Sequence, residues 1–272
     1  NAGSEGYNVG IGYNAGVNVT TGINQILIGG NAGVTLSDGA NNVAIGRSAL
    51  STAQSDSNNT AIGYAALSSQ NGAGTAYNVA IGHQAGVNVT TGQFNTLIGG
   101  LVGDSLTSGA YNVAVGYNAL ASEDAHGRNI AIGTNALTTQ DAGADAYNLA
   151  IGHNAGLSVT TGVQNIIIGG LAGDGLTTGE RNAAVGHAAL GTEDTGSRNT
   201  AFGWSALTTL NYDGNGYNTA MGYAAGMSVT SGIQNTIIGA LAGDALTTGV
   251  ANAALGYQAL GAEDTGERNV AI

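Results

Sequence analysis

The residue types that this sequence lacks already narrow its structural class. Cysteine, proline and lysine are absent from the 272 residues, and aromatic residues make up only 5%. Without cysteine there is no disulfide framework and no thiolate metal site. Without proline the 48 glycines do not indicate collagen, which needs both residues in a three-residue period. Because large side chains are scarce, we expect a narrow core that is repeated many times.

Charge is also scarce and almost all of one sign. Charged residues make up 8% of the chain, and the formal net charge is −12. The basic residues are five arginines, namely Arg47, Arg128, Arg181, Arg198 and Arg268. Since they form no basic patch, we expect no nucleic-acid partner. No apolar run predicts membrane insertion of this segment, and a start at Asn1 without methionine favours a piece of a longer protein.

What the sequence does contain is one five-residue word, Asn-x-Ala-Ile-Gly, in sixteen strict or loose copies. The copies begin at Asn8, Gln25, Asn42, Asn59, Asn78, Asn95, Asn112, Asn129, Asn148, Asn165, Asn182, Asn199, Asn218, Asn235, Asn252 and Asn269. Three equal steps are followed by one step that is longer by two, as from Asn59 to Asn78, and this cycle recurs. The cycle divides the chain into super-repeats that cover residues 1–70, 71–140, 141–210 and 211–272.

A rung of about 17 residues is too short for a helical repeat, which needs more than about thirty residues. It suits one turn of a coil built from short strands. We therefore predict an all-β fold, a parallel β-solenoid or β-roll with 16 rungs of about 17 residues, left-handed and continuous over residues 1–272. Stacked at about 4.8 Å per rung, such a coil is elongated.

The word also predicts which side chains face inward. Its fourth residue is large and apolar in every copy, as in Ile45, Ile62 and Ile81, and we expect these side chains to form an inner ladder. The third residue then points the other way, because side chains alternate along a strand. It is never polar, and on every fourth rung it is large: Leu27, Leu97, Ile167 and Ile237. We predict that this face is the seam of a homo-oligomer, most simply a trimer.

The two ends of the word predict corners of the coil. The closing glycine permits a positive φ, and asparagine tolerates left-handed backbone. Stacked asparagine amides can also satisfy one another along the coil axis. We therefore predict a structural ladder that includes Asn42, Asn59, Asn78, Asn95, Asn112 and Asn129.

These words resemble two known repeat families. Asn78-Val79-Ala80-Ile81-Gly82 followed by x-x-Ala resembles the YadA-type (Hep/Hag) head repeats of trimeric autotransporter adhesins. The run from Thr90 to Gly99, Thr-Thr-Gly-Gln-Phe-Asn-Thr-Leu-Ile-Gly, is similar to the repeat shafts of phage tail fibres. The resemblance covers the whole chain and implies a left-handed β-roll, a trimer and a host-binding role, with no binding residue carried over.

The polar residues of the repeat offer few candidates for a site. His83, His153 and His187 take positions that tyrosine takes in other copies, so we interpret them as exposed corners rather than metal ligands. The resulting line of Tyr, His and Trp204 suits rung-on-rung stacking, or contact with a glycan or receptor. His126 is also not expected to bind metal.

Acidic residues recur in pairs and singly, and carboxylate oxygens are ligands that calcium prefers. The pairs are Glu123-Asp124, Glu193-Asp194 and Glu263-Asp264, each followed by an arginine, and the single residues are Asp104, Asp174 and Asp244. We interpret the pairs as solvated loop ion pairs of small energetic value. Calcium remains a weaker alternative, and no other cofactor or metal is predicted.

Catalysis needs unique residues in a concave site, whereas a repeat presents the same side chains many times. We predict no enzymatic activity and no catalytic residues. The favoured function is a structural fibre or adhesive shaft that self-associates into an extracellular, cell-surface or virion appendage. The alternative is an ice-binding solenoid that uses Thr20-Thr21, Thr90-Thr91 and Thr160-Thr161. A repeat-built polysaccharide lyase is a third hypothesis, for which the sequence offers no catalytic cluster.

Overall fold

The computed structural model describes residues 6–72 and 74–272. Within these residues the secondary structure is sixteen short parallel strands, with no helix. The predicted all-β parallel β-solenoid is therefore confirmed, and its rungs have the predicted length. Residues 1–5 and 73, which belong to the first two predicted super-repeats, lie outside the described residues.

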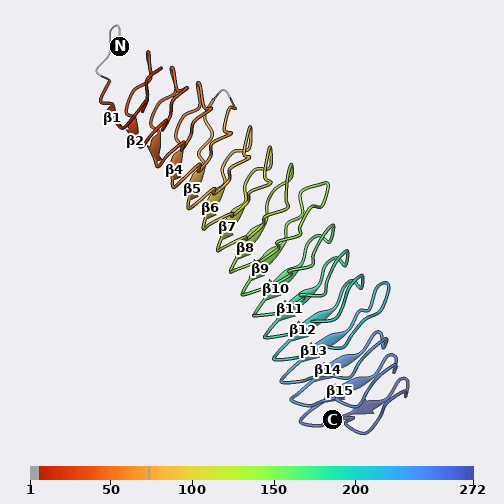
Figure 1. Cartoon of the computed structure of the whole chain (residues 1–272). Coiled ribbons are helices and arrows are strands. Elements are labelled where there is room, and N and C mark those ends of the chain that lie inside the picture. The colour runs from red at the N-terminus through yellow and green to blue at the C-terminus, as the bar shows by residue number, and fades with distance from the viewer. Residues whose placement is uncertain (1–5, 73) are drawn as a thin grey trace. The chain divides into compact units, whose positions relative to one another are not determined.

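The chain divides into two compact units, and Figure 1 shows the strands of each unit stacked in chain order. Unit 1 comprises the described residues of Asn1–Ile132 with Gly143–Asp145, and unit 2 comprises Gly133–Ala142 with Ala146–Ile272. The strands of unit 1 are β1 (Val9–Ile11), β2 (Ile26–Ile28), β3 (Val43–Ile45), β4 (Thr60–Ile62), β5 (Val79–Ile81), β6 (Thr96–Ile98), β7 (Val113–Val115) and β8 (Ile130–Ile132). Those of unit 2 are β9 (Leu149–Ile151), β10 (Ile166–Ile168), β11 (Ala183–Val185), β12 (Thr200–Phe202), β13 (Thr219–Met221), β14 (Thr236–Ile238), β15 (Ala253–Leu255) and β16 (Val270–Ala271).

Each strand pairs in parallel with the strands of the rungs before and after it in its unit. Val9 pairs with Ile26, across the shorter of the two steps found in the sequence. Thr60 pairs with Val79, across the longer step. The same positions of the word thus meet on successive rungs, and the two extra residues of every fourth rung are absorbed in a loop outside the strand.

The glycine that closes each word turns the corner as predicted. From Gly12 to Gly256 these glycines have φ between +126° and +145°. They also stand against main chain, since a Cβ on Gly29 would lie 2.6 Å from the carbonyl carbon of Gly46. The prediction for the asparagine corner was displaced by one residue. The left-handed residue is the one before each ladder asparagine, such as Asn58 (φ 62°) or Tyr77 (φ 53°).

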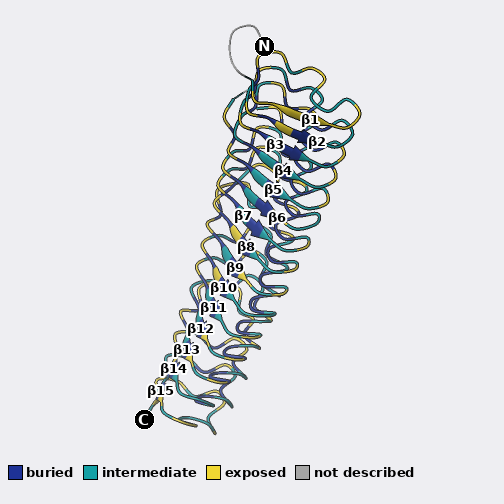
Figure 2. Ribbon diagram, turned by 90° about the vertical axis from the view of Figure 1, so that its left-hand side faces the viewer, coloured by how far each residue is buried: buried dark blue, intermediate teal, exposed yellow. Residues whose placement is uncertain are grey.

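The predicted direction of the strand side chains is wrong. The middle residue of each strand, which is the third residue of the word, points into the coil, and from Ala44 to Ala254 it is at most 1% exposed. The outer strand residues are half-buried or exposed (Figure 2). Ile98, for example, is 36% exposed. The expected inner isoleucine ladder therefore lies on the outside of the coil.

The predicted seam is consequently part of the core. Its four residues, Leu27, Leu97, Ile167 and Ile237, are between 0% and 2% exposed. They face glycines on the opposite wall: a Cβ on Gly16 would lie 2.6 Å from Leu27 Cδ1. On other rungs a leucine of the opposite wall, such as Leu50 or Leu67, is itself fully buried and the middle residue is alanine. The large residues therefore fill the volume that glycine leaves inside the coil and cannot contact another chain.

Candidate functional site

The outer sheet face of each unit is the surface made by the first and third residues of its strands. In unit 2 the third residues include Phe202, Met221 and Leu255, which are 52%, 47% and 49% exposed. In unit 1 the same position holds Ile28, Ile45 and Ile62, which are half-buried. This third strand residue, which is the fourth residue of the word, is apolar on every rung. Each unit therefore carries an apolar column on its surface.

Two further columns flank the outer sheet face. The asparagine-side column consists of the residues directly before the ladder asparagines. In unit 1 the rings of Tyr77 and Phe94 stack there at 5.5 Å between centroids, and those of Phe94 and Tyr111 at 5.0 Å. The guanidinium of Arg128 then lies 5.0 Å from the centre of the Tyr111 ring. A planar cation thus ends this aromatic stack.

The glycine-side column consists of the residues directly after the corner glycines. Tyr64 and His83 stack in unit 1 at 5.2 Å between ring centroids. In unit 2 His187 and Trp204 stack at 6.3 Å, and Trp204 and Tyr223 at 4.9 Å. His83, His153 and His187 are exposed in this column, as expected for corner residues. The predicted line of Tyr, His and Trp204 is therefore a stacked surface column.

The asparagine ladder lies inside the coil. The six predicted residues, Asn42, Asn59, Asn78, Asn95, Asn112 and Asn129, are at most 1% exposed. The Oδ1 atom of the first five accepts the main-chain N–H of the next ladder asparagine; Asn95 N donates to Asn78 Oδ1 at 2.9 Å. In four of them the amide nitrogen also donates to a main-chain carbonyl on the next rung, as Asn95 Nδ2 does to Gly109 O at 2.9 Å. The ladder therefore joins side chain to main chain.

Contacts between one ladder amide and the next occur in unit 2. Asn235 Nδ2 donates to Asn218 Oδ1 at 3.2 Å, and Asn252 Nδ2 donates to Asn235 Oδ1 at 3.2 Å. The amide stacking that was predicted is thus present there as an addition to the main-chain bonds. Both forms satisfy polar groups that are cut off from water.

The acid pairs differ from the solvated loop ion pairs that were expected. Glu123 and Glu193 are 0% exposed. The arginine that follows the first of these pairs, Arg128, has its Nε 2.6 Å from Asp145 Oδ2 at the surface of the same unit. The first acid of each of these two pairs is therefore an interior group of the coil, which the sequence pattern did not reveal.

Glu193 is held by main-chain donors. Gly196 N donates to Glu193 Oε1 at 2.9 Å, and Tyr212 N donates to the same oxygen at 3.3 Å. Glu193 Oε2 is buried with no hydrogen-bond partner. Burial raises the pKa of Glu193, and the neighbouring Asp194 charge also raises it, while the main-chain donors oppose the shift.

In the first super-repeat an aspartate, three residues further along the repeat, supplies a carboxylate equivalent to that of Glu193. Ala53 and Asp56 stand two super-repeats before Glu193 and Gly196. Asp56 is 0% exposed, and its Oδ1 accepts from Gly72 N at 2.8 Å. Gly72 in turn stands two super-repeats before Tyr212, the donor to Glu193. Two different side chains therefore place a carboxylate oxygen against the same main-chain N–H of the repeat.

One acidic cluster brings possible cation ligands together among the described residues. In unit 1 Glu123, Asp124 and His126 can each bring one ligand atom within 4.8 Å of the others. Glu123 Oε1, however, already accepts the main-chain N–H of His126 at 3.1 Å. Burial raises the pKa of Asp104 and of Asp174, which disfavours their charged forms. Calcium binding stays the weaker, untested alternative of the sequence analysis.

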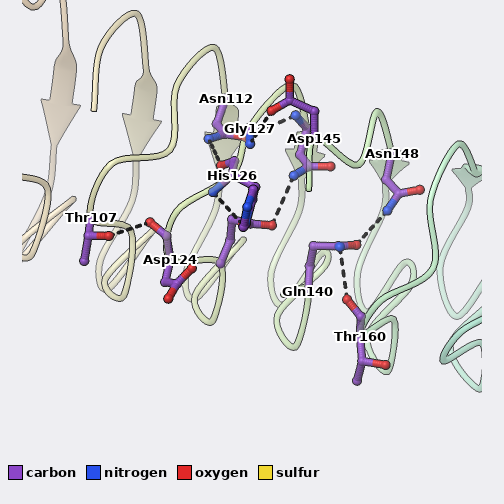
Figure 3. A network of polar contacts seen from close by, with 11 residues as sticks. Thr107, Asn112, Asp124, His126, Gly127, Gln140, Asp145, Asn148 and Thr160 are labelled. Atoms are coloured by element: carbon purple, nitrogen blue, oxygen red, sulfur yellow. Dashed lines mark hydrogen bonds and ion pairs between the residues drawn. The ribbon is translucent and has the colours of Figure 1, made fainter. Parts of the chain in front are cut away.

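The threonines named for the ice-binding alternative lie in polar loops of the coil. Thr90 Oγ1 donates to Thr107 O at 3.2 Å in unit 1, and Thr160 Oγ1 donates to Thr177 O at 3.3 Å in unit 2. In unit 2 the chain of contacts continues from Asn148 Nδ2 to Gln140 Oε1, and from Gln140 Nε2 to Thr160 O (Figure 3). These hydroxyls are therefore engaged in bonds between rungs.

The described part of the chain contains no helix long and apolar enough to cross a membrane. A comparison with protein-family models found none that matches this chain, and a comparison with curated proteins found no match either.

Proposed function

We propose that this chain is a structural β-solenoid that self-associates through its outer sheet face into an elongated extracellular or virion appendage. In this role it presents a repetitive surface for attachment and catalyses no reaction. The observation that carries the proposal is the exposed apolar column along β9 to β15, in which Phe202 and Met221 are about half exposed.

Several properties support a mechanical role. Every rung repeats the same strand pairing, so stability is the sum of many similar interfaces between neighbouring rungs. The ladder asparagines and the corner glycines serve the coil itself. The column of third strand residues on the outer sheet face is apolar on every rung and is only partly covered inside its unit.

The size of this face suits association. If about half of each outward apolar side chain is exposed, a unit presents on the order of several hundred Å², which approaches one side of a standard protein interface. Apolar patches of that size on soluble proteins commonly mark interaction sites. A second copy of the chain has the same rung spacing along its own face and can pack against it over many rungs. We propose a homo-oligomer, most simply a trimer.

The experiment is a measurement of oligomeric state by sedimentation velocity and native mass spectrometry. The paired substitution Phe202→Glu and Met221→Glu places two charges on the outer sheet face. We expect the wild-type chain to associate and this variant to dissociate at the same concentration. Thr178→Glu with Ser231→Glu adds the same charge at exposed loop positions and serves as the matched control.

Circular dichroism must show that both variants keep the β-solenoid signal. A wild-type chain that stays monomeric at high micromolar concentration would reject self-association. An oligomer that survives the outer-face charges but not the loop charges would place the interface elsewhere. Electron microscopy of the intact assembly then tests whether the association produces a fibre.

A further inference from the structure

The glycine-side column has a gap on every fourth rung. There the position after the corner glycine is small, namely Gly30, Gly100, Gly170 and Ala240. Main-chain bonds place Gly100 between His83 and Tyr117: Leu101 N donates to His83 O, and Asn118 N donates to Gly100 O, both at 3.0 Å. In unit 2 the equivalent bonds place Gly170 between His153 and His187.

The backbone does not require glycine at these positions. Gly100 and Gly170 are outside the left-handed region that favours glycine. A Cβ on Gly100 would meet only Tyr117 Cδ2 at 3.6 Å, and one on Gly170 would approach His187 Cδ2 at 3.6 Å, which are ordinary van der Waals contacts. A Cβ on Gly30 would meet nothing within 4 Å. The space over Gly30 is therefore open, and a side chain at Gly100 or Gly170 would make ordinary contacts with one ring of the next rung, in contrast to the main-chain clashes at the corner glycines.

The gap has the thickness of one planar group. Adjacent rings of this column stack at 4.9 Å where Trp204 meets Tyr223. Strands two rungs apart are separated by about 9.6 Å, which is twice the spacing between neighbouring strands. A flat group at the level of Gly170 would lie at stacking distance from both His153 and His187. The outward side chain of the same rung, Ile168, is apolar and half-buried.

The chain itself indicates which group completes such a column. In the glycine-side column the guanidinium of Arg47 lies 5.9 Å from the centre of the Tyr64 ring. In the asparagine-side column of unit 2 the guanidinium of Arg198 lies 5.8 Å from the Tyr217 ring. Guanidinium groups stack on aromatic faces through cation–π attraction. The net charge of −12 further favours a cation over a neutral ring.

We propose that the gaps at Gly100 and Gly170 each bind one planar cation, a guanidinium group or a cationic heteroaromatic ring, stacked between the two flanking rings. The gap at Gly30 is different, because Arg47 forms one of its sides and repels a second cation. At the fourth gap the methyl group of Ala240 takes up part of the space. The expected stoichiometry is therefore two planar cations per chain. The residues of this site are distinct from the outer sheet face through which self-association is proposed above.

The probes are arginine amide, the planar benzothiazolium dye thioflavin T, and lysine amide as a cation without a planar group. Binding to the full chain is followed by calorimetry, by dye fluorescence and by the emission of Trp204, which stacks on His187. We expect saturable binding of the two planar probes and at least tenfold weaker binding of lysine amide. Equal affinity for lysine amide would overturn the proposal.

The decisive variant fills both gaps. Gly100→Tyr with Gly170→Tyr introduces the residue that Tyr117 and Tyr223 supply on other rungs, so the column closes on itself and binding of planar cations should fall at least tenfold. Gln164→Tyr adds a tyrosine on the rung of Gly170 but in the asparagine-side column, and should leave binding unchanged. Unchanged affinity in the filled variant would refute the assignment.

Removing the rings gives a second test that does not depend on the filled variant folding. Tyr117→Ala with His187→Ala takes one wall from each gap and should weaken binding at least fivefold; an unaltered affinity would also count against the site.

The source of the cation is resolved by sedimentation. Dissociation of associated chains by arginine amide, but not by lysine amide, would identify an arginine of a second copy. Binding with no change in oligomeric state would identify a free ligand.

Discussion

Leu97 occupies the space that Gly86 leaves open on the facing wall of the coil. A Cβ on Gly86 would lie 2.7 Å from Leu97 Cδ1, and one on Gly103, a rung further on, would lie 3.1 Å from Leu97 Cδ2. One leucine thus fills the volume vacated by glycines on two successive rungs. This relation explains why a large residue recurs at the middle strand position only on every fourth rung.

The first prediction contrasts Leu97 with its neighbour on the strand. Leu97→Ala leaves a cavity between two glycines and should lower the free energy of unfolding by about 2–5 kcal/mol. Ile98→Ala removes a side chain that is 36% exposed and should cost about 1 kcal/mol or less. Urea denaturation of both full-length variants measures the difference. Equal losses would show that the inward direction of Leu97 is not what stabilises the coil.

The second prediction concerns the asparagine ladder. Asn95→Ala removes the acceptor for Asn112 N and the donor to Gly109 O, and each unpaired buried group costs about 1–3 kcal/mol. Asn95→Gln is the matched variant, because Gln25 takes this position on another rung and accepts from Asn42 N at 3.3 Å. We expect thermal unfolding to show the larger loss for alanine. If glutamine were as damaging as alanine, the loss would reflect packing rather than these bonds.

The third prediction tests whether the buried carboxyl group can be supplied from position 196 in place of position 193. Gly196→Asp alone places a second carboxyl against Glu193, since a Cβ at Gly196 would lie 2.5 Å from Glu193 Oε2. It should destabilise the chain by about 3 kcal/mol or more. Adding Glu193→Ala recreates the Ala53 and Asp56 pattern of the first super-repeat and should recover much of the loss. A double-mutant cycle measures the coupling, which should reach about 2–3 kcal/mol; additive losses would contradict the exchange.

The fourth prediction concerns pH. Burial holds the pKa of Glu193 above its usual range, so the folded state binds this proton more tightly than the unfolded state. Its contribution to stability is complete below the unfolded pKa of about 4.3 and is lost as pH rises through the folded pKa. Glu193→Gln keeps the acceptor for Gly196 N and removes the titration. We expect the melting temperature of this variant, relative to wild type, to increase from pH 4 to pH 7. A constant difference would mean that Glu193 does not titrate in this window.

The sequence by itself determined the period of the rungs, with its longer fourth step, the strands and the parallel register, because one word recurs at each rung. It also indicated the corner glycines and the interior asparagines, whose backbone and hydrogen-bonding requirements are local. Those features need no knowledge of what faces them across the coil.

The tertiary structure alone decided which side of each strand is inside. Alternation along Val79, Ala80 and Ile81 fixes that neighbours point in opposite directions, but it is symmetric and does not say on which side the coil closes. The facing wall decides that, because its leucines leave room only for alanine and its glycines make room for Leu97. The burial of Glu193 and the position of Gly170 between two histidines were also decided by the tertiary structure, since both depend on groups brought together from neighbouring rungs.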